Sequence, residues 1–183
     1  MHLPRIWFET LPRDLIAVAV MAALGMGCGL ALNAWRAQPL ALRYVPKADR
    51  LQQAVENFLP PAGSPAAASK VVVVDLKTFR EMVDGKEARV LDARPEVFYQ
   101  LGHVPGAINL PREDFQARYG ELRTELERSK ARRIVVYCSD SDCEDSQLVA
   151  EALVKLAYPS VYVFRGGWDV WTNAHLPEEK AQP

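Results

Sequence analysis

A single apolar run near the N-terminus constrains this chain more than any other feature of its sequence. The run from Leu15 to Trp35 reads LIAVAVMAALGMGCGLALNAW and contains no Asp, Glu, Lys, Arg or His. As a helix it would be about 31 Å long, which is enough to cross the hydrocarbon core of a bilayer. Arg13 and Arg36 bracket the run, as basic residues commonly do at membrane spans. We therefore predict a transmembrane anchor at residues 15–35, after an N-terminal flank at residues 1–14.

A cleaved signal peptide and a buried core helix are the two alternatives to an anchor. The run is longer than a signal peptide requires, and no clear small-x-small cleavage site follows it. We therefore expect a single-pass protein of a bacterial inner membrane. Gly25 and Gly29 form a GxxxG pattern, which lets two membrane helices approach closely, so the sequence also suggests an anchor-mediated homodimer.

The basic residues around the anchor leave its orientation open. Two of them precede the apolar run and four follow it closely, and these are Arg5, Arg13, Arg36, Arg43, Lys47 and Arg50. The positive-inside rule therefore favours a cytoplasmic C-terminal domain. The N-terminal amine narrows the difference, so both sides of the membrane stay open.

The segment that follows the anchor, residues 36–69, has an amphipathic part and a linker. Residues 47–59 carry apolar side chains at helical spacing, namely Leu51, Val55, Phe58 and Leu59. Residues 60–69 read PPAGSPAAAS, a composition typical of a linker. We predict a folded domain over residues 70–177 and a tail over residues 178–183.

Short apolar strands alternate with helical patterns throughout the predicted domain. The predicted strands are 71–74, 89–92, 107–110, 133–137 and 161–164, and the predicted helices are 76–83, 96–101, 115–129 and 147–156. Such alternation is typical of a largely parallel sheet with helices on both faces. The predicted fold class is therefore α/β.

Cys138 occupies the position at which α/β proteins commonly place their chemistry. It follows the predicted strand 133–137 directly, and ligands bind outside the carboxyl ends of parallel strands. Backbone N–H groups and the dipole of a following helix stabilise a thiolate at such a place, which lowers the pKa of a thiol. The alternative is a small buried hydrophobic residue, which an isolated cysteine usually is. A catalytic role requires the sulfur to be ionised and accessible.

Four separated motifs give this arrangement a family resemblance. They are Leu91–Arg94 (LDAR), Gly102–Pro111 (GHVPGAINLP), Val135–Cys138 (VVYC), and Gly166–Trp168 (GGW) with Trp171. In order and spacing they resemble the rhodanese-like (sulfurtransferase) domain. The resemblance implies a parallel central sheet and a catalytic Cys138 that takes sulfane sulfur from a donor as a persulfide. It also implies transfer of that sulfur to a thiol or protein acceptor, with no cofactor and no metal.

The loop that begins at Cys138 departs from the usual family pattern. It reads CSDSDCEDS and is longer than usual, with no basic residue before Lys155. Its candidate substrate-binding residues are Ser139, Asp140, Ser141, Asp142, Glu144 and Asp145. Their carboxylates repel anionic donors and raise the pKa of a nearby thiol, which disfavours thiosulfate as the donor.

The same acidic residues also permit a structural interpretation. Ser141 and Glu144 match a capping box, which would place them at the start of the next helix. Cysteine phosphatases of related fold need an arginine at the position of Glu144 to bind phosphate bidentately. Phosphatase chemistry is therefore disfavoured.

Three further residues complete the candidate site. Cys143 is a candidate resolving thiol that would form an intramolecular disulfide with Cys138, and a structural thiol is the alternative. Asp92 and Arg94 lie at the end of a predicted strand near the site, in a supporting role in which Arg94 pairs with a carboxylate.

The overall charge excludes one class of function. Lys and Arg total 22 against 23 Asp and Glu, so the chain lacks the positive surplus that a nucleic-acid binder uses. The predicted function is that of a membrane-anchored sulfurtransferase with Cys138 as the sulfur carrier and thiol redox activity at Cys143. The alternative is a catalytically inactive rhodanese-like module, tethered to the membrane, whose acidic loop binds a basic partner protein.

Overall fold

The computed structural model describes residues 6–37, 39–40, 44–59 and 70–180. Within it the chain divides into two compact units, Met1–Tyr44 and Val45–Pro183. The predicted linker at residues 60–69 lies outside the described residues.

The first unit contains one long helix, α1, which spans Ile6–Ala34. Its segment Arg13–Ala34 has 22 residues and a mean hydropathy of 2.3, so it is long and apolar enough to cross a membrane. This segment is not buried inside the protein, which argues against the core-helix alternative. A signal sequence passes the same test of length and composition.

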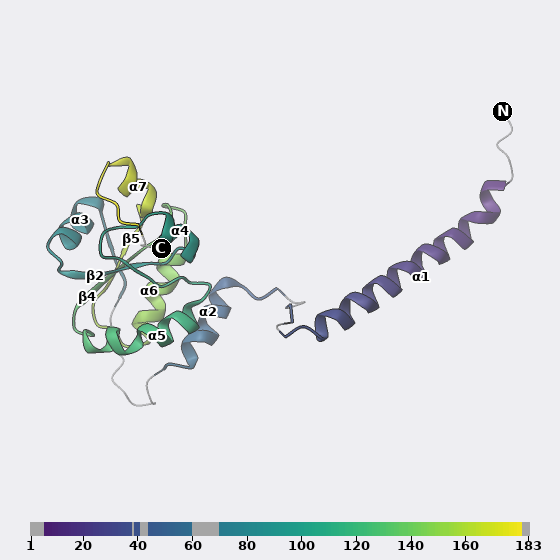
Figure 1. The fold of residues 1–183 in the computed structure, drawn as a ribbon, viewed down its shortest axis with the longest axis horizontal. Coiled ribbons are helices and arrows are strands. Elements are labelled where there is room, and N and C mark those ends of the chain that lie inside the picture. The colour runs from purple at the N-terminus through teal and green to yellow at the C-terminus, as the bar shows by residue number, and fades with distance from the viewer. Residues whose placement is uncertain (1–5, 38, 41–43, 60–69, 181–183) are drawn as a thin grey trace. The chain divides into compact units, whose positions relative to one another are not determined.

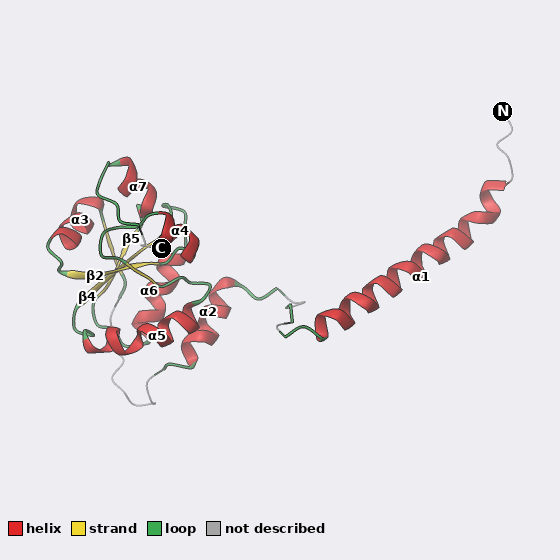
Figure 2. Ribbon diagram, in the orientation of Figure 1, coloured by secondary structure: helices red, strands yellow, loops and turns green. Residues whose placement is uncertain are grey.

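The second unit is built on a five-stranded sheet in the order β1-β5-β4-β2-β3. Figures 1 and 2 label three of its strands, β2, β4 and β5. Every neighbouring pair of strands is parallel. The strands are β1 (Val72–Val74), β2 (Ala88–Asp92), β3 (Ile108–Asn109), β4 (Arg133–Tyr137) and β5 (Val161–Phe164). The helices of this unit are α2 (Lys47–Glu56), α3 (Leu76–Asp84), α4 (Glu96–Leu101), α5 (Phe115–Arg128), α6 (Asp145–Lys155) and α7 (Gly167–Asn173). The predicted α/β class with a parallel sheet is confirmed.

Alternate side chains of the sheet enter two separate cores, because successive strand residues point to opposite faces. One core packs α2, α5 and α6 against residues such as Leu91 and Val136. The other packs α3 and α7 against residues such as Val90 and Val135. Both faces of β2 and β4 are therefore covered, which explains why successive residues in the middle of each strand are apolar.

The compact unit begins and ends outside the predicted limits of 70–177. The amphipathic helix α2 buries Leu51 and Val55 in the core that it shares with α5 and α6. At the other end, the backbone of Glu179 exchanges two hydrogen bonds with that of His103, at 2.8 and 2.9 Å. The predicted amphipathic segment and the first residues of the predicted tail thus pack on the domain, α2 through its apolar side chains and Glu179 through its backbone hydrogen bonds.

Candidate active site

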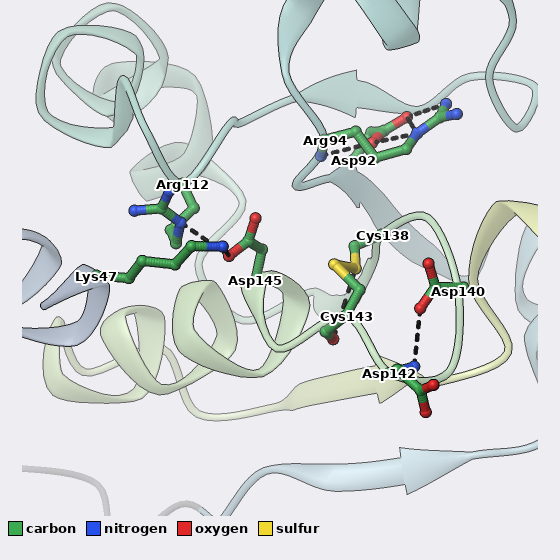
Figure 3. Close-up of a disulfide and its surroundings, with 9 residues drawn as sticks. All are labelled: Lys47, Asp92, Arg94, Arg112, Cys138, Asp140, Asp142, Cys143 and Asp145. Carbon is green, nitrogen blue, oxygen red and sulfur yellow. Dashed lines mark hydrogen bonds and ion pairs between the residues drawn. A yellow bond between two sulfur atoms is a disulfide. The ribbon is translucent and has the colours of Figure 1, made fainter. Parts of the chain in front are cut away.

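Cys138 lies where the sequence predicts it, immediately after β4 at the carboxyl edge of the sheet. A disulfide joins it to Cys143, with the two Cα atoms 6.4 Å apart (Figure 3). That separation is ordinary for a disulfide. Cys138 is 1% exposed, whereas Cys143 is partly exposed. The accessible sulfur that catalysis requires is therefore absent from this oxidised form.

Backbone N–H groups at the start of α7 hold the first residues of the loop. Trp168 N donates to the carbonyl oxygen of Cys138 at 2.7 Å, and Asp169 N donates to that of Ser139 at 2.9 Å. Gly167 makes this approach feasible, because its φ of +64° favours glycine and a Cβ there would lie 2.7 Å from backbone atoms of Ser139 and Asp140. The Gly-Gly-Trp motif thus fixes the loop against β4.

The capping box predicted for Ser141 and Glu144 does not form. Helix α6 begins at Asp145, so Glu144 is the N-cap itself and makes no side-chain capping bond. A capping box would need Glu144 inside the first turn. The loop is instead tightened by Asp140, whose Oδ1 accepts a hydrogen bond from Asp142 N at 2.8 Å (Figure 3).

Cations from distant parts of the chain meet the acidic loop. Arg112 Nε lies 2.8 Å from Asp145 Oδ1, and Lys47 Nζ lies 3.6 Å from the same oxygen (Figure 3). Arg165 lines a cavity of about 440 Å³ together with loop residues that include Cys143 and Glu144. None of these cations lies near Cys138 in the sequence. The local sequence alone therefore predicted a more negative site than the structure has.

These cations were not predicted, although a signal for two of them existed. Arg112 follows β3 closely and Arg165 follows β5 directly. The carboxyl ends of parallel strands meet at one edge of the sheet, which is the edge that carries Cys138. Lys47 lies on α2, and nothing in the local sequence indicates that it approaches α6.

Asp92 and Arg94 form a buried ion pair beside the loop (Figure 3). Arg94 Nη2 lies 2.7 Å from Asp92 Oδ2 and donates to the carbonyl oxygen of Gly102 at 2.7 Å. Tyr137 donates its hydroxyl hydrogen to Asp92 Oδ2 at 2.6 Å. Arg94 therefore pairs with its strand neighbour rather than with a carboxylate of the loop.

Burial and charge shift the pKa values of this cluster. Burial, which lowers the pKa of Arg94, is outweighed by the hydrogen bond and the charge of Asp92, so that pKa is raised. Burial and the neighbouring Asp92 carboxylate raise the pKa of Tyr137 far above its usual range. The guanidinium is thus charged and the phenol neutral at any physiological pH.

Six of the candidate residues line one of two cavities, whereas Asp92, Asp140 and Asp145 line neither. Arg94 and Ser139 line one of about 370 Å³, together with Trp168 and Asp169. The cavity of about 440 Å³ is lined by the later loop residues, Ser141, Asp142, Cys143 and Glu144 among them. Cys138 lines neither of these two cavities. In the described part of the chain, no three or more His, Cys, Asp or Glu side chains group as metal ligands would.

Comparison with known proteins assigns this fold and loop to a family. The model of the rhodanese-like domain matches residues 75–174, and the chain belongs to that family.

Two curated relatives and one solved structure illustrate the relationship. The chain is 31% identical to 3-mercaptopyruvate sulfurtransferase of Escherichia coli over 64% of its own length and 47% of the relative's. It is 31% identical to adenylyltransferase and sulfurtransferase UBA4 of Candida albicans, over 55% of its own length and 23% of that protein. The solution structure of the rhodanese-like domain of the Alr3790 protein from Anabaena has a TM-score of 0.50 at 25% identity, covering 61% of this chain and 81% of that one. The chain thus spans less than half the length of these two curated relatives.

Proposed function

We propose that this protein is a sulfurtransferase that carries sulfane sulfur as a persulfide on Cys138. The observation that carries the proposal is the place of Cys138 after β4, in a loop whose carbonyl groups bond to the backbone of α7. Family membership and sulfurtransferase-named relatives support the same reaction class.

The reaction begins from the reduced form. The Cys138 thiolate attacks the outer sulfur of a donor, the donor's bond to that sulfur breaks, and the rest of the donor leaves with the electron pair. An acceptor thiolate, from a small molecule or a protein, then attacks the outer sulfur of the persulfide and restores the Cys138 thiolate. Because the sulfur of Cys138 is bonded to that of Cys143, a reductant must first cleave the disulfide.

The proposal places the domain at a membrane through α1. The segment Arg13–Ala34 supplies the length and hydropathy of a single span. A bacterial inner membrane suits such an anchor, and pairing through Gly25 and Gly29 would give a homodimer. A reporter fused after Pro183 that is active on only one side of the membrane would establish the orientation.

Persulfide formation on Cys138 is the first expected result. After reduction and removal of the reductant, exposure of Cys143→Ser protein to cysteine persulfide should add about 32 Da, the mass of one sulfur atom, because no second thiol of the loop can then discharge the persulfide. Intact-protein mass spectrometry after rapid alkylation measures the increment. Cys138→Ser/Cys143→Ser should not acquire it, whereas Cys28→Ser/Cys143→Ser, which removes the exposed thiol of Cys28, should behave like Cys143→Ser.

A protein-binding module is the second candidate function, and the burial of Cys138 favours it. A cysteine that is 1% exposed and locked in a disulfide cannot exchange sulfur, while the acidic loop beside it remains available to a basic partner. Failure of reduced Cys143→Ser protein to gain sulfur from cysteine persulfide, from 3-mercaptopyruvate and from thiosulfate would decide for this alternative.

Loop charge should determine the preference among donors. Asp140, Asp142 and Glu144 have no ion pair with a cation in the described residues, so they repel the dianion thiosulfate. Replacing all three with their amides should raise the rate of persulfide formation from thiosulfate roughly 10-fold at low salt, and less at high salt, where screening already weakens the repulsion. Stopped reactions at two ionic strengths measure this change. Cysteine persulfide, which carries a smaller net negative charge than thiosulfate, serves as the control donor, and its rate should change less. Equal changes for both donors would contradict the electrostatic explanation.

A further inference from the structure

We propose that Cys143 is a resolving thiol that discharges the Cys138 persulfide as hydrosulfide. The inference rests on the proposed function and extends it to a second activity of the same site. The Cys143 thiolate attacks the inner sulfur of the persulfide, which belongs to Cys138. The sulfur–sulfur bond of the persulfide breaks, hydrosulfide leaves with the electron pair, and the Cys138–Cys143 disulfide forms.

The backbone geometry already suits the product of this step. The Cα atoms of Cys138 and Cys143 are 6.4 Å apart, within the range that a disulfide spans. The sulfur of Cys138 lies 3.6 Å from the carbonyl oxygen of Cys143, so the backbone of residue 143 is in contact with that sulfur. No displacement of β4 or α6 is needed for the two sulfurs to bond.

Cys143 is also the best-placed nucleophile. Cys28, the third cysteine of the chain, lies in the other compact unit. A thiol held on the same short loop has an effective concentration far above that of a dissolved thiol. Attack by Cys143 on the Cys138 persulfide should therefore be faster than transfer of the outer sulfur to thiols in solution.

The exposure of the two sulfurs sets the direction of the return step. Cys143 lines the cavity of about 440 Å³, together with Asp142, Glu144 and Arg165, whereas Cys138 does not. A dithiol reductant therefore attacks the sulfur of Cys143, and Cys138 leaves as the thiolate. The second thiol of the reductant then attacks the mixed disulfide, which frees Cys143 and oxidises the reductant. The partner implied by the chemistry is a dithiol, and each cycle converts one sulfane sulfur into hydrosulfide.

A single-turnover experiment tests the resolving role. Full-length Cys28→Ser protein in detergent is reduced, freed of reductant and given one equivalent of cysteine persulfide. We expect about one hydrosulfide per chain without any added thiol, and a final protein mass about 2 Da below that of the reduced protein, as disulfide formation requires. The matched variant Cys28→Ser/Cys143→Ser should keep the added sulfur at least about 10-fold longer and release it only when a thiol is supplied.

The outcomes separate this inference from the proposed function. If both proteins gain the sulfur and lose it at the same rate, Cys143 does not resolve the persulfide, although the sulfurtransferase proposal stands. If neither gains the sulfur, the sulfurtransferase proposal itself fails. A monothiol added to the oxidised protein should be recovered on Cys143 by peptide mapping, and recovery on Cys138 would contradict the proposed direction of reduction.

Discussion

Replacing Arg94 with methionine should lower the free energy of unfolding by about 3–5 kcal/mol, because it leaves a buried carboxylate without its cation. Asp92 is fully buried, and Arg94 supplies three of the contacts to its carboxylate, from Nε and Nη2 at 2.7 to 3.1 Å. The hydrogen bond from Tyr137 remains but cannot neutralise the charge. Denaturant unfolding of the detergent-solubilised protein, followed by tryptophan fluorescence, measures the loss.

Two further variants test whether Arg94→Met loses stability because the Asp92 carboxylate is left unpaired, or because removal of any arginine is destabilising. Arg123 pairs with Glu127 on the exposed face of α5 at 2.8 Å, and Arg123→Met should change stability little because solvent screens that pair. The double variant Asp92→Leu/Arg94→Met removes both charges and should be more stable than Arg94→Met alone. A double variant as unstable as the single one would show that packing, and not charge, causes the loss.

The sheet could be predicted because its longer strands have consecutive apolar residues at their centres. RVLD, RIVVY and VYVF each lie between charged or turn residues, so β2, β4 and β5 stand out in the sequence. The edge strand β3 is shorter than predicted, at Ile108–Asn109, since it pairs with β2 alone. Helix α6 begins two residues before the predicted residue 147. The prediction rested on the spacing of apolar residues, and the first two residues of the helix, Asp145 and Ser146, are polar.

The site was predicted only where its residues are neighbours in the sequence. Cys138 and its loop follow from the strand and from the motif, whereas Arg112 and Lys47 reach Asp145 through tertiary packing. Helix α2 illustrates the same limit, because an amphipathic pattern shows that a face will be buried without showing against what. Long-range contacts of this kind depend on the sheet order, which no local pattern specifies.

Gly167→Ala should slow persulfide formation on Cys138 at least about 10-fold, since displacement of a catalytic loop by a fraction of an ångström to 1 Å commonly costs that much or more. The new Cβ would lie 2.7 Å from backbone atoms of Ser139 and Asp140, so either the loop or the start of α7 must move. That movement breaks the hydrogen bonds from Trp168 N and Asp169 N to the loop carbonyl groups. The rate of sulfur gain from cysteine persulfide, followed by mass spectrometry, measures the effect.

Gly106 provides the matched control for this variant, because both glycines have a positive φ but they differ in their surroundings. Gly106 has a φ of +72° and Gly167 one of +64°, so alanine meets a similar conformational cost at both. A Cβ at Gly106 would have no atom within 4 Å, and the residue lies in a turn away from Cys138. Gly106→Ala should therefore lower stability by about 1 kcal/mol and leave the rate of sulfur gain unchanged. Equal loss of rate in both variants would mean that backbone strain, rather than contact with the loop, controls the reactivity of Cys138.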